Sequence, residues 1–167
     1  MNIVFVGDSG VGKTSLIRKL TYTHQLPFQF NQYKPTIGLD FKKYHSYLLW
    51  DTAGRPRFDA IVKSYIKNVF VFVIVYINTE ESFDSVQEYI NQIIESKSQA
   101  PYVVVCNNID DARANESKNK NEACYYPSIS FTFDNNDCSI DKILLLAKQQ
   151  RPEIVHTVNL YLPPIIV

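Results

Sequence analysis

The chain has 167 residues and a mass of 19.3 kDa, which suits one folded domain with a sizeable core. Hydrophobic residues make up 46% and charged residues 20%, and Lys plus Arg balance Asp plus Glu at 17 each, so net charge gives no argument for nucleic acid or an anionic membrane as partner. The three cysteines, Cys106, Cys124 and Cys138, lack CxxC spacing, so neither a disulfide framework nor a zinc site is expected.

Strand-like and helix-like segments alternate along the chain, which favours a parallel sheet covered by helices. The first half is expected to hold a buried strand at 3–6, a helix at 14–20, a loop at 21–37, and two short strands at 39–44 and 47–51. Pro27, Pro35 and the polar residues around them indicate the loop. A tight turn at His45 is expected to join the two short strands.

The second half begins with an apolar, β-branched segment at 70–77, which predicts a central strand. Asn78 and Glu81 suggest a capping box in front of a helix that runs to Ser96, with Phe83, Val86, Ile90 and Ile93 at helical spacing. The remaining expected elements are a strand at 102–106, a weakly helical segment at 112–122, a strand at 128–133 and a helix at 139–150, closed by Pro152. One domain is therefore expected over 1–153, followed by an irregular tail at 154–167.

The segment from Gly7 to Thr14 matches the pattern G-x-x-x-x-G-K-[ST] and lies between an expected strand and an expected helix. Glycines let the backbone wrap around phosphate groups, and a helix N-terminus attracts anions. Lys13 would reach the β- and γ-phosphates, and the Thr14 hydroxyl would bind Mg²⁺. The pattern leaves open whether the nucleotide is ATP or GTP. The expected phosphate-binding residues are Asp8, Ser9, Gly10, Val11, Gly12, Lys13, Thr14 and Ser15.

The segment Trp50-Asp51-Thr52-Ala53-Gly54 resembles the WDTAG element of Ras-like small GTPases. The resemblance implies that Asp51 holds Mg²⁺ through water and that the N–H of Gly54 senses the γ-phosphate. It also implies the α/β fold of a P-loop NTPase. This is a three-layer sandwich with a mostly parallel central sheet, one antiparallel edge strand and helices on both faces. A P-loop kinase or ATPase would not carry this element.

Residues 36–42, TIGLDFK, resemble the corresponding stretch of Rab proteins. By this resemblance, Thr36 is the switch threonine that completes the coordination of Mg²⁺ when GTP is bound. Effector and regulator proteins would bind through switch regions at about 28–42 and 54–67, and no nucleic acid partner is expected. The implied role is a GTP/GDP switch in vesicle trafficking and protein transport.

The segment Asn107-Asn108-Ile109-Asp110 resembles the family's guanine-binding N-K-x-D motif. Asp110 would accept two hydrogen bonds that guanine can donate and adenine cannot, while Asn107 would support the loop and touch the base. Ser130 and Phe131 stand where the family has a loop over the guanine, although only Ser130 matches its pattern. Asn108 replaces a lysine whose long stem packs along the base, so weaker affinity and faster exchange are expected.

Arg55 occupies the position of the glutamine that orients the attacking water in this family. A guanidinium group has only donors and cannot accept the hydrogen of water, so slow or absent intrinsic hydrolysis is expected. The alternative is that Arg55 places its charge on the γ-phosphate like a built-in arginine finger. The expected catalytic residues are Arg55, Lys13, Thr36 and Gly54, and the expected Mg²⁺ ligands are Thr14, Thr36 and Asp51. The competing hypothesis is a pseudo-GTPase that serves as an interaction module.

The expected localisation is cytoplasmic, because no secretory signal pattern opens the chain and the longest apolar run, 69–77, is too short to cross a bilayer. Rab proteins usually end in prenylated cysteines, but residues 163–167 contain none. Peripheral attachment to membranes is therefore an open alternative. The segment between Thr36 and Asp51 is also shorter than in most Rab proteins, so partner identity does not carry over.

Overall fold

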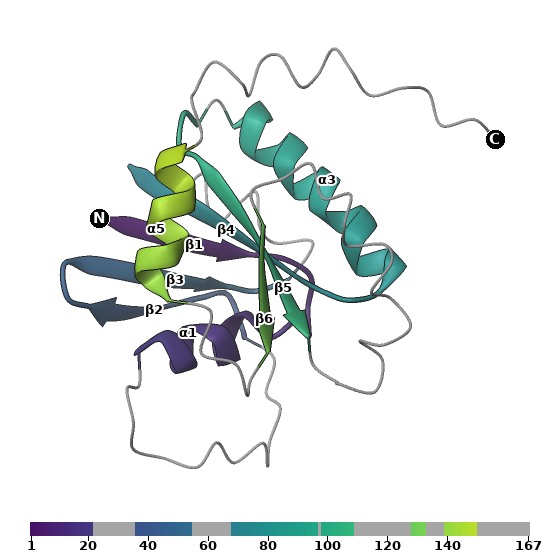
Figure 1. Cartoon of the computed structure of the whole chain (residues 1–167), viewed down its shortest axis with the longest axis horizontal. Helices are drawn as coiled ribbons and strands as arrows, with labels where there is room; N and C mark the ends of the chain where they lie inside the picture. The colour runs from purple at the N-terminus through teal and green to yellow at the C-terminus, as the bar shows by residue number, and fades with distance from the viewer. Residues whose placement is uncertain (22–35, 55–67, 97, 109–127, 133–138, 150–167) are drawn as a thin grey trace.

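In the part of the chain that the structure describes, six strands form one sheet at the centre (Figure 1). The computed structural model describes residues 1–21, 36–54, 68–96, 98–108, 128–132 and 139–149. The strands lie in the order β2-β3-β1-β4-β5-β6, and of these β2 alone runs antiparallel to its neighbour. The mostly parallel sheet with one antiparallel edge strand is therefore confirmed. In chain order the elements are β1 (Asn2–Val6), α1 (Lys13–Thr21), β2 (Leu39–Tyr44), β3 (Tyr47–Thr52), β4 (Val69–Ile77), α3 (Glu80–Glu95), β5 (Tyr102–Asn108), β6 (Ser128–Thr132) and α5 (Ile140–Gln149).

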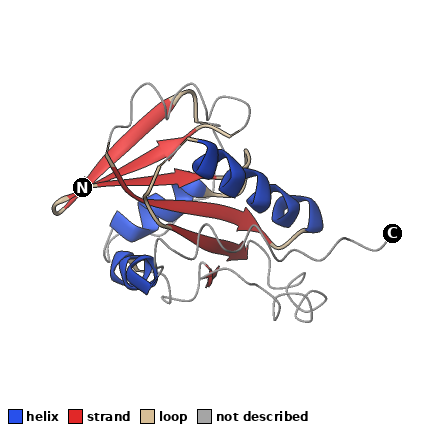
Figure 2. Cartoon of the chain, turned by 90° about the horizontal axis from the view of Figure 1, so that it is seen from above, coloured by secondary structure: helices blue, strands red, loops and turns tan. Residues whose placement is uncertain are grey.

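Helices cover both faces of the sheet (Figures 1 and 2). Successive side chains of β1 point to opposite faces, so Ile3 and Phe5 join one buried cluster while Val4 and Val6 join the other. Helices α1 and α5 close the first cluster, and α3 closes the second. The central strands are buried on both sides, which is why β4 is almost uninterruptedly apolar.

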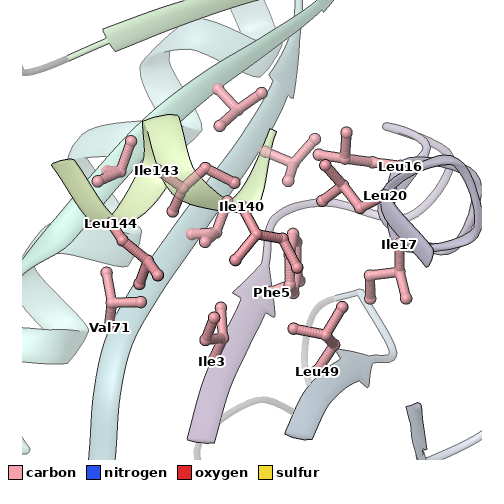
Figure 3. Packing of buried hydrophobic residues seen from close by; sticks show 14 of the residues in the cluster. Ile3, Phe5, Leu16, Ile17, Leu20, Leu49, Val71, Ile140, Ile143 and Leu144 are labelled. Carbon is pink, nitrogen blue, oxygen red and sulfur yellow. The ribbon is translucent and has the colours of Figure 1, made fainter. Parts of the chain in front are cut away.

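The cluster beneath α1 and α5 ties the two helices to β1 (Figure 3). Ile143 and Leu144 come from α5 on one side, Ile17 comes from α1 on the other, and Phe5 lies between them. The inward-facing residues expected for the last helix, Ile140, Ile143, Leu144 and Ala147, are all buried. This packing fixes the end of β1, and hence the start of α1, in one place.

The start of α3 differs from the expected capping box at Asn78 and Glu81. The N-cap is Thr79, whose extended backbone (φ −127°, ψ 152°) precedes the helix and whose hydroxyl accepts a hydrogen bond from the N–H of Ser82 at 3.3 Å. The prediction was wrong because Asn78 lies inside a tight turn, in which the carbonyl oxygen of Ile77 accepts a hydrogen bond from the N–H of Thr79 at 2.7 Å. The helix consequently begins one residue later.

The turn predicted at His45 is confirmed. Tyr44 pairs with Tyr47 across the β2–β3 hairpin, and His45 has a positive φ of 51°. Most of the loop at 21–37, the helical segment at 112–122, Pro152 and the boundary at 153 lie outside the described residues. Within the part of the chain that the structure describes, no helix is long and apolar enough to cross a membrane.

Candidate functional site

The loop between β1 and α1 follows the carboxyl end of a central strand, where parallel sheets usually bind ligands. Gly7, Gly10 and Gly12 have positive φ values of 142°, 87° and 88°. Space is also tight, because a Cβ on Gly7 would lie 2.1 Å from the carbonyl oxygen of Val75, and one on Gly12 would lie 2.3 Å from Nδ2 of Asn107. At Gly7 and Gly12, glycine is therefore required for both backbone conformation and close approach.

Lys13 begins α1 and folds back over the loop. Its Nζ donates hydrogen bonds to the carbonyl oxygens of Gly7 and Asp8, both at 2.7 Å, and the residue is only 5% exposed. Burial lowers the pKa of Lys13 from 10.5 to about 8, although the charges of Asp51 and Asp8 act in the opposite direction. An ammonium has three N–H donors, so a third can reach an anionic ligand.

Two hydroxyls and one carboxylate from separate segments meet beside this lysine. The Thr14 hydroxyl donates to Oδ2 of Asp51 at 2.5 Å, the Thr36 hydroxyl donates to the same oxygen at 3.1 Å, and the two hydroxyls are 2.9 Å apart. The structure thus brings together the three residues that the sequence assigned to Mg²⁺. A hydroxyl that gives its proton to a carboxylate still offers lone pairs to a cation.

Asp51 is 4% exposed, and its second oxygen, Oδ1, is buried without a hydrogen-bond partner among the described residues. Burial raises the pKa of Asp51 above its usual value, while hydrogen bonds from Thr14 and Thr36 and the charge of Lys13 lower it. A bound cation would satisfy the orphaned oxygen and stabilise the charged carboxylate. In the described part of the chain, no three His, Cys, Asp or Glu residues gather to hold a metal, so an ion here would rely on hydroxyls as well. The residues present therefore fit a small hard cation such as Mg²⁺.

Gly54 lies directly against the phosphate loop. A Cβ at this position would approach the backbone nitrogen of Ser9 to 2.3 Å and the carbonyl carbon of Asp8 to 2.9 Å. The preceding N–H, that of Ala53, donates to the carbonyl oxygen of Gly38 at 3.0 Å. This bond joins the segment after β3 to the segment that carries Thr36.

Asn107 approaches the loop from the end of β5. Its Nδ2 donates to the carbonyl oxygen of Val11 at 2.8 Å, and its buried Oδ1 has no partner among the described residues. In the sheet, the backbones of Ser130 and Phe131 lie beside Cys106 and Asn107. The two segments expected at the guanine base therefore share one edge of the sheet.

Several residues that the sequence predicts at the site are not among those that the structure describes. Arg55 and Asp110 lie outside the described residues, as do positions 28–35 and 55–67 of the two switch regions. The backbone of Asn108 ends β5, opposite Thr132.

Tyr89 is a contact of the loop that sequence reasoning missed. This residue of α3 is 1% exposed, and its hydroxyl donates to Oδ1 of Asp8 at 3.2 Å. The expected helical stripe included Phe83, which is instead 37% exposed, and left Tyr89 out. A tyrosine beside buried aliphatic residues was the available clue, because a buried phenol usually needs a hydrogen-bond partner.

Comparisons with known proteins agree with this geometry. Residues 2–139 match the model of the Ras family. The chain is also 37% identical over 124 residues to the Ypt/Rab-type GTPase ypt71 of Schizosaccharomyces pombe. This alignment covers 66% of the chain, and the chain spans 57% of the length of that relative. The resemblance to Rab-like small GTPases is confirmed, and the chain belongs to the Ras family.

Proposed function

We propose that this protein is a guanine-nucleotide switch, which binds GTP or GDP together with Mg²⁺ and hydrolyses GTP slowly. One observation carries the proposal: the side chains of Thr14, Thr36 and Asp51 are hydrogen-bonded to one another beside Lys13, next to the glycine loop. Hydroxyls and a carboxylate suit Mg²⁺, while the lysine and the loop N–H groups suit phosphates. Similarity to a Ypt/Rab-type GTPase supports guanine as the base.

Each residue of the site has a binding role in this proposal. Lys13 donates to the terminal phosphates, and residues 8–15 surround them with backbone N–H groups. Thr14, Thr36 and Asp51 hold Mg²⁺, which supplies positive charge to the phosphate oxygens when it is bound. Thr36 and Gly54 lie on segments that the Ala53–Gly38 bond connects, so a ligand at one segment biases the other. Asp110 selects guanine, and Asn107 touches the base.

Hydrolysis in this family is an in-line attack of water on the γ-phosphate. Arg55 stands where a glutamine would orient that water, and a guanidinium group cannot accept its hydrogen. Intrinsic turnover is accordingly slow. The same substitution favours a second candidate, a pseudo-GTPase that keeps nucleotide without turnover and acts as an interaction module.

Effectors and regulators are proposed to bind the switch regions, about 28–42 and 54–67. Part of this surface is apolar: Ile37 is 86% exposed and Phe41 is 54% exposed. The ring of Phe41 lies 5.2 Å from that of Trp50. Exposed apolar patches rimmed by polar residues are typical of protein contact sites. The organisation proposed for the chain is a nucleotide-binding domain at 1–153 with a tail at 154–167.

The deciding experiment identifies the nucleotide that copurifies with the full chain and then measures its turnover. We expect GDP or GTP by ion-pair chromatography, and slow release of phosphate from loaded GTP. Adenine nucleotide in its place would contradict the assignment of Asp110. Bound GTP that is never converted to GDP, alone or with cell lysate added, would favour the pseudo-GTPase.

A further inference from the structure

Tyr89 connects the phosphate loop to the helix on the far side of the sheet. Its ring is buried in the cluster beneath α3, which contains Val4, Val6 and Ile90. The loop leads from β1 into α1, whose inner face belongs to the opposite cluster. The hydrogen bond from the Tyr89 hydroxyl to Asp8 at 3.2 Å is therefore a bridge between the loop and the other layer.

Asp8 is the point at which three parts of the site meet. Its carbonyl oxygen accepts from Nζ of Lys13 at 2.7 Å, and its carbonyl carbon lies against Gly54. Its side chain accepts from Tyr89. A change in the orientation of Asp8 would consequently alter its contacts with both Lys13 and the segment after β3.

The two faces of the sheet hold the loop from opposite directions. Val11 packs into the cluster beneath α1 and α5, whereas Asp8 is bound from the α3 side. The bond also directs the negative charge of Asp8 toward α3. In a loop that receives phosphates, an unrestrained carboxylate could turn toward the anionic ligand and repel it.

We propose that Tyr89 is a positioning residue for the phosphate loop: its hydroxyl fixes the Asp8 side chain and thereby slows nucleotide release. This inference rests on the proposed nucleotide-binding function and adds a residue to it. A tyrosine that only filled the core would need its ring but not its link to Asp8. Removing the hydroxyl alone distinguishes a positioning residue from a residue that only fills the core, because only the positioning role predicts faster nucleotide release.

The first measurement compares the release of N-methylanthraniloyl-GDP from the full chain and from Tyr89→Phe. Loss of a hydrogen bond to a charged group predicts release about tenfold faster. Tyr102→Phe is the matched control, because Tyr102 packs against the same cluster from the start of β5, away from the loop. Its release rate should stay within about twofold of wild type. A Tyr89→Phe rate within the same range would overturn the proposal.

The second measurement approaches the bond from its other end. Asp8→Ala removes the carboxylate that Tyr89 directs away from the ligand. Tyr89→Phe should therefore accelerate release about tenfold in the wild-type background but by less than about twofold in the Asp8→Ala background. Fully multiplicative effects of the two single changes would show that the residues act independently and would overturn the proposal.

Hydrogen exchange in nucleotide-free protein separates this inference from the proposed function. Tyr89→Phe should increase exchange in a peptide covering residues 7–13, and Tyr102→Phe should not. Faster exchange in Tyr89→Phe, found together with a wild-type protein that fails to bind guanine nucleotide, would refute the switch and keep the positioning role. Unchanged exchange in a protein that binds GDP normally would refute the positioning role alone.

Discussion

Asn107 is a buried polar side chain whose amide holds the phosphate loop through the carbonyl oxygen of Val11. Replacing it with Ala leaves that carbonyl without its donor, which predicts a loss of about 1–3 kcal/mol in the free energy of unfolding. Asn107→Asp should cost more, because the carboxylate cannot donate and is repelled by the carbonyl oxygen. Urea unfolding of nucleotide-free protein measures both changes. Equal stability of wild type and Asn107→Ala would contradict the bracing role.

At Arg55, the chemistry of the side chain predicts the rate of hydrolysis. Arg55→Gln restores an acceptor for the attacking water and should increase single-turnover phosphate release at least about tenfold. Arg55→Ala, which restores no acceptor, is the control and should not produce this increase. Phosphate release that is already rapid in wild type and lost in Arg55→Ala would instead identify Arg55 as a built-in arginine finger.

Among the elements, α3 depends on a cap that was assigned to the wrong residue from sequence. Asn78 and Thr79 are both good capping types, and local sequence alone did not distinguish between them. Ile77 pairs with Asn107 of β5 at the end of the strand, and the tight turn that follows places the cap at Thr79. Tertiary pairing thus decided a boundary that local preference left ambiguous.

The assignment of the helix cap to Thr79 can be tested by measuring the free energy of unfolding of two variants. Thr79→Ala removes the acceptor for the N–H of Ser82 and should cost about 1 kcal/mol in the free energy of unfolding, measured by urea titration. Thr79→Ser keeps the hydroxyl and should retain most of the stability. Equal losses in both variants would mean that the methyl group, and not the cap, is responsible.

For the whole molecule, ligand binding and folding are linked because the proposed ligand contacts the loop after β1 and residues of β3 and β5 at one edge of the sheet. GDP with Mg²⁺ at about 100 times its Kd should stabilise the fold by about 2.7 kcal/mol. For a domain of this size, that corresponds to a rise of about 5–10 °C in Tm. Chelation of Mg²⁺ with EDTA should reverse much of the rise and accelerate release of GDP. ATP at the same concentration is the control and should not raise the Tm. A Tm unaffected by GDP would contradict the proposed nucleotide site.

The sequence by itself determined the α/β architecture and the phosphate loop. Apolar β-branched runs mark the buried strands, and the glycines of the loop specify a local backbone that needs no distant partner. These features could be predicted because they depend on residues that are neighbours in the chain.

Only the tertiary structure decided which distant residues meet. Asp51 comes beside Thr14 because β3 pairs in parallel with β1, with Asp51 opposite Phe5. Asn107 and Tyr89 reach the loop because β5 ends at the same edge and α3 packs across the opposite face. Such contacts depend on strand order and on the faces that helices cover, which chain spacing does not encode. The phosphate loop was therefore evident from its own residues, whereas its supports were set by the packing of both layers around it.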